Sequence, residues 1–165
     1  MREAYGDLFK ARADALIVTT TAIRRRDGRA VMGAGIAKAF AVRYPGLEAR
    51  LGQLLAVQGN LGHLLHRGCA QPWPCFSSSS RSSCWRALRS YPSNEDWRQP
   101  SSLELVERGA GQLVELAERE GCLRLGLPRP GCGFGGLSWD GQVRPLLARL
   151  LDDRFWVVER FPRRA

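Results

Sequence analysis

The feature of this sequence that most limits its fold is the alternation of short apolar runs with longer segments of helical periodicity. Residues 15–20 read ALIVTT, an unbroken apolar and β-branched run that predicts a strand buried on both faces. The same reasoning predicts strands at 61–66, 84–91, 122–127 and 155–159, and helices at 35–44, 47–55, 101–120 and 143–151. Strands that alternate with helices form mostly parallel sheets covered on both faces. We therefore expect an α/β fold with three layers, α/β/α, around a mostly parallel central sheet.

The start of the third predicted helix carries a capping signal. Ser101 is followed three residues later by Glu104, which is the spacing of a capping box. The hydroxyl of the first residue in such a box accepts a hydrogen bond from the first helical turn. The sequence therefore predicts that Ser101 caps this helix.

The length of 165 residues predicts one domain, residues 1–165. The stretch at about 68–84 contains a serine run and three cysteines without periodicity. It is predicted to be either a disordered insertion or a segment that has diverged under little constraint. The sequence contains no run of 18 apolar residues, and its first residues lack the apolar segment of a secretory signal. We expect a cytoplasmic protein without membrane contact.

The five cysteines and two histidines show no spacing typical of a zinc site, and no metal is expected. An odd number of cysteines in a cytosolic chain favours free thiols. Cys132 could act as a nucleophile only beside a base. The other interpretation of Cys132, which the sequence favours, is a small buried apolar residue.

The net charge of +9 comes almost entirely from arginine, since Lys10 and Lys38 are the only lysines. A basic surface favours polyanionic partners such as DNA or RNA. The arginines are scattered along the sequence, however, apart from residues 24–26 and the tail at 160–164. This scatter favours an ordinary solvated surface, and nucleic-acid binding stays open as the other interpretation.

Two glycine-rich loops each follow a predicted strand and precede a predicted helix. The first reads VMGAGIA at 31–37, and the second reads PGCGFGG at 130–136. In a parallel sheet both loops lie at the carboxyl edge of the strands, where ligands bind. Backbone N–H groups there, with the positive end of the next helix, can cradle an anion. We predict a phosphate or diphosphate against Gly33 and Gly35, although Lys38 fits neither a Walker A loop nor a Rossmann fingerprint.

The stretches GDLF, ADALIVTT, VMGAGIA and PGCGFGGLSW occur in this order along the chain. Together they resemble the macrodomain family over nearly the whole chain outside residues 68–84. Within that family they look most similar to the branch of the terminal-ADP-ribose protein glycohydrolase and of the antitoxins that strip ADP-ribose from DNA. The resemblance implies an α/β/α module whose ligand is ADP-ribose, with no other cofactor.

The resemblance also implies roles for individual residues. Asp7 would accept a hydrogen bond from the adenine amino group, Leu8 would contribute backbone, and Phe161 would offer a shelf for the adenine. The first loop would line the diphosphate and distal ribose through Val31, Met32, Gly33, Ala34, Gly35 and Ile36. The second loop would cover the same groups through Gly131, Cys132, Gly133, Phe134 and Gly135.

Three positions depart from the pattern of the family's catalytic members. Thr21 stands where an asparagine amide would hold the distal ribose, and Asn94 stands where a catalytic lysine would be. Gly135 replaces an acidic residue of the second loop. A hydroxyl lacks the donor and acceptor pair of an amide, and asparagine cannot act as a base or nucleophile.

These departures favour a module that binds ADP-ribose, or an ADP-ribosyl group on protein or nucleic acid, over an enzyme. One alternative is a hydrolase that removes ADP-ribose from protein or nucleic acid by a substrate-assisted route. The other is an arginine-rich protein that contacts DNA or RNA and whose pocket is vestigial.

Overall fold

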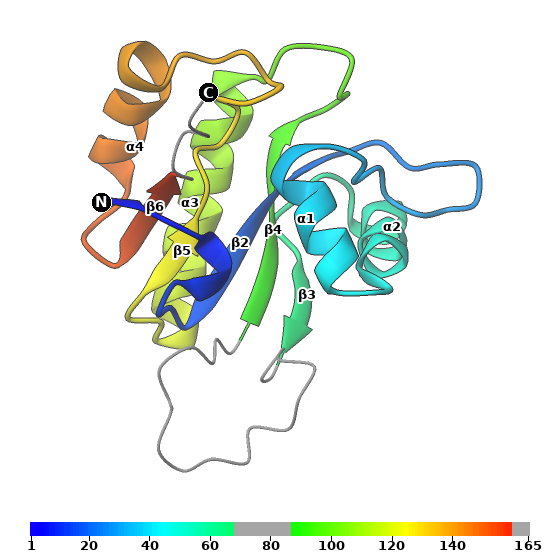
Figure 1. The fold of residues 1–165 in the computed structure, drawn as a ribbon, viewed down its shortest axis with the longest axis horizontal. Helices are drawn as coiled ribbons and strands as arrows, with labels where there is room; N and C mark the ends of the chain where they lie inside the picture. Colours follow the sequence, from blue (N-terminus) through cyan, green and yellow to red (C-terminus); the bar gives the residue numbers. More distant parts are fainter. Residues whose placement is uncertain (68–86, 160–165) are drawn as a thin grey trace.

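The computed structural model describes residues 1–67 and 87–159. Its centre is a six-stranded sheet with the strand order β1-β6-β5-β2-β4-β3 (Figure 1). Neighbouring strands run parallel except β3 and β4, which are antiparallel, so the expected mostly parallel sheet is confirmed. The strands are β1 (Arg2–Tyr5), β2 (Ala15–Thr21), β3 (Leu64–Arg67), β4 (Ala87–Asn94), β5 (Leu125–Leu127) and β6 (Phe155–Glu159).

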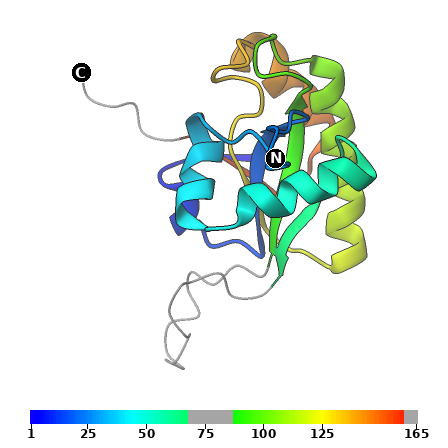
Figure 2. The same ribbon diagram turned by 90° about the vertical axis from the view of Figure 1, so that its right-hand side faces the viewer.

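Helices cover both faces of the sheet, and Figure 2 shows the sheet edge-on between α1 and α3. One face carries α1 (Gly35–Arg43) and α2 (Leu47–Gln58), and the other carries α3 (Leu103–Glu120) and α4 (Arg144–Leu150). A short 3-10 helix, η1 (Leu8–Lys10), follows β1, and a π-helical turn, η2 (Trp139–Val143), leads into α4. The three-layer α/β/α architecture is therefore confirmed. None of the helices in the described ranges combines the length and apolar character needed to span a bilayer.

Two separate apolar clusters hold the three layers together. Ile17 of β2 belongs to the cluster with α3 and α4, whereas Leu16 and Val18 belong to the cluster with α1 and α2. All three side chains are fully buried. The run at residues 15–20 is continuous in apolar character because both of its faces are covered, as its sequence predicted.

Some strand boundaries differ from the sequence prediction. β1 was not predicted, because it pairs only with β6 at the edge of the sheet and carries exposed residues in place of an apolar run. β4 continues to Asn94, three residues beyond the predicted end. The predicted insertion at 68–84, and the predicted start of this strand at residue 84, lie outside the described residues.

Helix α3 is capped by Ser102 and not by Ser101. The Oγ of Ser102 accepts a hydrogen bond from the N–H of Leu105 at 3.4 Å. Ser101 is buried, and its backbone N–H donates to the carbonyl of Gly135 at 2.9 Å. The capping-box prediction is wrong by one residue because the second glycine loop holds Ser101 instead.

Candidate functional site

The connections that follow β2 and β5 lead to opposite faces of the sheet, and these two strands are neighbours in it. The chain after β2 passes to α1 on one face, and the chain after β5 passes to η2 and α4 on the other. Such a switch point, at the carboxyl ends of the strands, is where open α/β sheets bind ligands. Both glycine-rich loops belong to these two connections.

The first glycine loop leads directly into the N-terminus of α1. Gly35, the first residue of this helix, has a φ of +54°, a conformation that favours glycine. Ala34 precedes it in an extended conformation and supplies no side-chain cap, so the first N–H groups of α1 lack an intrahelical or capping partner. Gly33, Ala34 and Gly35 are exposed. Of the other predicted residues, Met32 is buried in the core, and Val31 and Ile36 are half-buried.

The second glycine loop is a compact turn held by its own backbone. The N–H of Leu137 donates to the carbonyl of Gly131 at 3.0 Å, and the N–H of Gly136 donates to the carbonyl of Gly133 at 3.2 Å. Gly133 and Phe134 are exposed, whereas Gly131 is buried. The middle of the loop therefore projects from the carboxyl edge of the sheet.

The two glycine loops lie side by side. A Cβ placed on Gly35 would lie 3.6 Å from Cδ2 and 3.7 Å from Cε2 of Phe134. The Phe134 side chain is 84% exposed, so it borders this place without being part of the core. We call residues 33–36 and 131–136 together the loop junction. Backbone from the ends of two neighbouring strands meets there, which is typical of an anion-binding site.

No family model matches the sequence, but comparisons with solved structures do identify the fold. The macrodomain of Thermus aquaticus DarG matches with a TM-score of 0.71 and 25% identity, over 96% of this chain and 97% of that one. Thermosipho africanus DarTG in complex with ADP-ribose matches with a TM-score of 0.72 and 24% identity, over 98% of this chain and 43% of that one. The chain has the macrodomain fold.

Similarity to a curated sequence also extends over nearly the whole chain. A DNA ADP-ribosyl glycohydrolase of Thermus aquaticus is 28% identical to this chain over an alignment of 166 positions, which covers 96% of the chain. The macrodomain spans 41% of that relative's length, so the match concerns one part of a longer protein. The resemblance inferred from the motifs is therefore confirmed.

Asp7 of the macrodomain lies between β1 and η1. Its Oδ1 accepts a hydrogen bond from the N–H of Phe9 at 3.0 Å and so caps η1. The ring of Phe9 lies 4.6 Å from that of Phe40 on α1, measured between centroids, and Leu8 is buried in the same cluster. The structure thus holds Asp7 on a segment that packs against the helix of the first loop. Phe161 lies outside the described residues.

Two of the three positions at which the sequence departs from the pattern of catalytic members, Thr21 and Asn94, are neighbours in the sheet. Thr21 on β2 pairs with Asn94 on β4, after an irregularity in the register. Within the described part of the chain, the buried Oγ1 of Thr21 has no hydrogen-bond partner. Asn94 is buried, its Nδ2 donates to the carbonyl of Gln99 at 2.8 Å, and its Oδ1 accepts from the N–H of Asp96 at 3.2 Å. Asn94 therefore serves to hold the turn that follows β4.

Cys132 in the second loop is not activated for chemistry. Burial raises the pKa of its thiol to about 11, and the opposing effect of the nearby Arg129 charge is smaller. Its Sγ donates to the carbonyl of Pro130 at 3.3 Å. Since only the thiolate is a nucleophile, this raised pKa disfavours nucleophilic chemistry at Cys132 at neutral pH.

Sequence reasoning missed Arg129, which anchors the start of the second loop. Its Nη1 donates to Glu159 on β6 at 2.7 Å, and its Nη2 lies 3.7 Å from the carboxylate of Glu3 on β1. The guanidinium also lies 4.7 Å from the ring centroid of Trp139. These contacts tie the loop to both strands at that side of the sheet. The only sequence signal for this role is an arginine placed between two prolines in PRPG.

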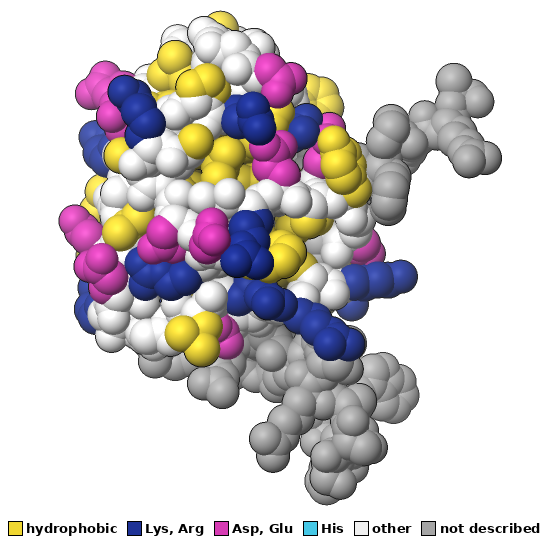
Figure 3. All heavy atoms as spheres, turned by 90° about the vertical axis from the view of Figure 1, so that its left-hand side faces the viewer, with side chains coloured by type: hydrophobic (Ala, Val, Ile, Leu, Met, Phe, Trp, Pro, Cys, Tyr) yellow, Lys and Arg dark blue, Asp and Glu magenta, His cyan; other side chains and the backbone are white. Residues whose placement is uncertain are grey.

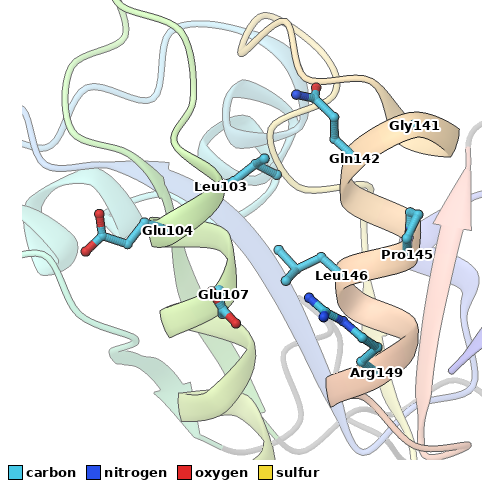
Figure 4. Close-up of a pocket in the computed structure, with 8 residues that line it drawn as sticks. All are labelled: Leu103, Glu104, Glu107, Gly141, Gln142, Pro145, Leu146 and Arg149. Atoms are coloured by element: carbon cyan, nitrogen blue, oxygen red, sulfur yellow. The ribbon is translucent and has the colours of Figure 1, made fainter.

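A separate hollow of about 630 Å³ lies between α3 and α4 (Figure 4). Leu103 and Leu146 line it, with Glu107 on one helix and Arg149 on the other. No residue of the loop junction lines this hollow. It is therefore not part of the candidate site.

Proposed function

We propose that this macrodomain binds ADP-ribose, both free and as the ADP-ribosyl group of a modified DNA strand. The observation that carries the proposal is the loop junction, where α1 starts without a side-chain cap beside Phe134 of the second loop. A diphosphate has the negative charge that such N–H groups bind. Two relatives support the choice of ligand: one structure of this fold is a complex with ADP-ribose, and one curated relative is named a DNA ADP-ribosyl glycohydrolase.

In this proposal, different residues of the site contact different parts of ADP-ribose. The diphosphate lies against the backbone at Gly33, Gly35 and Gly133, and Phe134 borders the distal ribose. The adenine amino group donates to Asp7, whose Oδ2 is not used by the cap on η1. The loops contact the nucleotide and not its carrier, so an ADP-ribosyl group on protein or RNA would fit the same contacts.

Hydrolysis of the bond between ADP-ribose and its carrier is the second candidate function, and the name of the curated relative favours it. Such a reaction needs a group that moves a proton at neutral pH. Thr21 and Asn94 occupy the expected positions, and neither side chain titrates in that range. Both polar atoms of the Asn94 amide are also engaged by the turn after β4. We expect binding with little or no turnover.

Titration calorimetry with free ADP-ribose tests the binding, and thermal unfolding provides a second readout. Ligand at 100 times its dissociation constant should stabilise the protein by about 2.7 kcal/mol. For a domain of this size that corresponds to a rise in melting temperature of roughly 5–11 °C. The absence of both heat and shift at millimolar ADP-ribose would refute the proposal. Release of ADP-ribose from an ADP-ribosylated oligonucleotide over many turnovers would instead establish the hydrolase.

A further inference from the structure

A second concave surface lies beside η1, on the face of β1, β6 and β5 that α1 and α2 leave uncovered. It encloses about 350 Å³, within the range of roughly 300–1,000 Å³ typical of small-molecule sites. We call it the η1 groove. Its lining comprises Ala4, Tyr5, Gly6, Asp7, Lys10, Ala11, Arg12, Ala13, Arg124, Gly126, Trp156 and Val158. Figure 3, which views the β1 side of the molecule, shows Lys and Arg side chains gathered around hydrophobic ones near the centre and lower right.

The charges that line the η1 groove are nearly all positive. Lys10, Arg12 and Arg124 contribute three cations, and Asp7 is the single carboxylate among the lining residues. No ion pair involving these three cations is found within residues 1–67 and 87–159. The hollow between α3 and α4 differs, because Glu107 on one helix and Arg149 on the other bring both signs of charge to it. A cleft lined by one sign of charge concentrates ligands of the opposite sign.

The apolar part of the η1 groove is built around Trp156. The guanidinium of Arg124 lies 4.7 Å from the centroid of the indole ring, and that of Arg2 lies 5.5 Å from it. Arg124 also donates from Nη1 to the carbonyl of Arg12 at 3.3 Å, which fixes it along the groove. Indole and guanidinium planes are the surfaces on which unpaired nucleobases stack. Cations and a stacking surface therefore share one groove.

We infer that the η1 groove binds single-stranded nucleic acid. The phosphodiester lies against Lys10, Arg12 and Arg124, and a base stacks on the surface formed by Trp156 and its arginines. Single strands are the partner that needs both features, because their bases are free to leave a stack and their backbone carries one charge per nucleotide. The bases of a duplex are stacked on one another and cannot stack on a side chain. A simple anion binds the cations but does not stack on the indole.

Binding of a single strand in the η1 groove extends the proposed function. Its use with an ADP-ribosylated DNA strand rests on that proposed function. The groove shares Asp7 with the proposed adenine position but none of its lining comes from the loop junction. Contacts between the groove and the strand add to the affinity for an ADP-ribosylated strand, independently of the contacts with ADP-ribose. Binding of an unmodified strand therefore tests the groove alone.

The experiment measures fluorescence anisotropy of a labelled, unmodified single strand of roughly 12 nucleotides over a series of salt concentrations. The test variant is Arg12→Ala with Arg124→Ala, two exposed residues whose loss should leave the fold intact. The matched control is Arg50→Ala with Arg119→Ala, which removes the same charge from exposed positions on α2 and α3. ADP-ribose binding of each protein is measured by calorimetry in parallel.

We expect the groove variant to bind the strand at least 10-fold more weakly than the parent. Its slope of log affinity against log salt should fall by about 1.4, since each contact with a single strand contributes about 0.7. The control should keep the slope of the parent, and Trp156→Ala should weaken binding about 5-fold or more without changing the slope. ADP-ribose binding should be the same in all four proteins.

The inference is overturned if the parent does not bind the strand, or if the control loses as much affinity as the groove variant. Equal affinity of the parent for a duplex of the same length overturns it too, because the stacking surface then plays no part. If the parent binds the strand but does not bind ADP-ribose, the proposed function is refuted and the inference about the η1 groove stands.

Discussion

Replacing Gly35 by glutamate is the most direct test of the loop junction. Gly35 begins α1 with a φ of +54°, and any side chain there starts 3.6 Å from the ring of Phe134. The backbone strain of an L-residue in this conformation is about 1–2 kcal/mol. In a domain of this size the melting temperature should therefore fall by roughly 2–8 °C, which leaves the protein folded at room temperature.

The effect of Gly35→Glu on binding should be larger than its effect on stability. The new carboxylate would stand between the two loops, where the proposed diphosphate lies. Two unit charges about 5 Å apart repel by about 3 kcal/mol at an effective dielectric constant of 20. That energy corresponds to a loss of roughly 100-fold or more in affinity for ADP-ribose, measured by calorimetry.

Gly121→Glu is the matched control for this variant. Gly121 ends α3 with a φ of +62°, and a Cβ there has nothing within 4 Å. It should therefore suffer similar backbone strain and the same change in charge but keep its affinity for ADP-ribose. If Gly35→Glu binds as tightly as the parent, the assignment of the loop junction is wrong. If Gly121→Glu loses as much affinity, strain and not ligand contact explains the result.

Three further predictions concern residues around the site. Asn94→Ala should lower the free energy of unfolding in urea by about 1–3 kcal/mol, because it removes the two hydrogen bonds by which this buried side chain holds the turn at 95–99; unchanged stability would argue against these bonds. Cys132, whose thiol pKa is about 11, should react with iodoacetamide about tenfold faster per pH unit above neutrality, and a plateau near pH 9 in peptide mass spectrometry would contradict its burial. The hydrogen bond from Arg144 lowers the pKa of Glu3 below 4.5, so its contribution to stability is present above that pH and is lost as the pH falls through the folded value. Glu3→Gln should therefore flatten the acid side of the stability profile, and an identical profile would disprove this pairing.

The sequence predicted the elements whose residues carry a strong local signal. The run at 15–20 is short, unbroken and rich in β-branched residues, which favours a buried strand. The two glycine loops follow from strand, turn and helix patterns that lie close together in the chain. Their meeting beside Phe134 also follows, because parallel strands place their carboxyl ends at one edge.

Features that depend on contacts between distant segments could not be predicted in this way. Ser101 fits a capping box locally, but the loop around Gly135 holds it, some 34 residues further along the chain. The arginines look scattered in sequence, yet Arg12 and Arg124 line one groove with Trp156 because β5 and β6 are neighbours in the sheet. Charge clusters of this kind exist only in three dimensions.

The close packing around Gly135 limits which residues can replace it. A Cβ there would lie 2.0 Å from the Oγ of Ser101 and 2.6 Å from the carbonyl oxygen of Gly131. Both distances are too short for a Cβ unless the neighbouring atoms move. The acidic side chain that catalytic relatives are expected to carry at this position would collide with the segment joining β4 to α3. An acidic residue at position 135 would first require this neighbouring connection to change shape, so a single substitution of Gly135 cannot supply a carboxylate there.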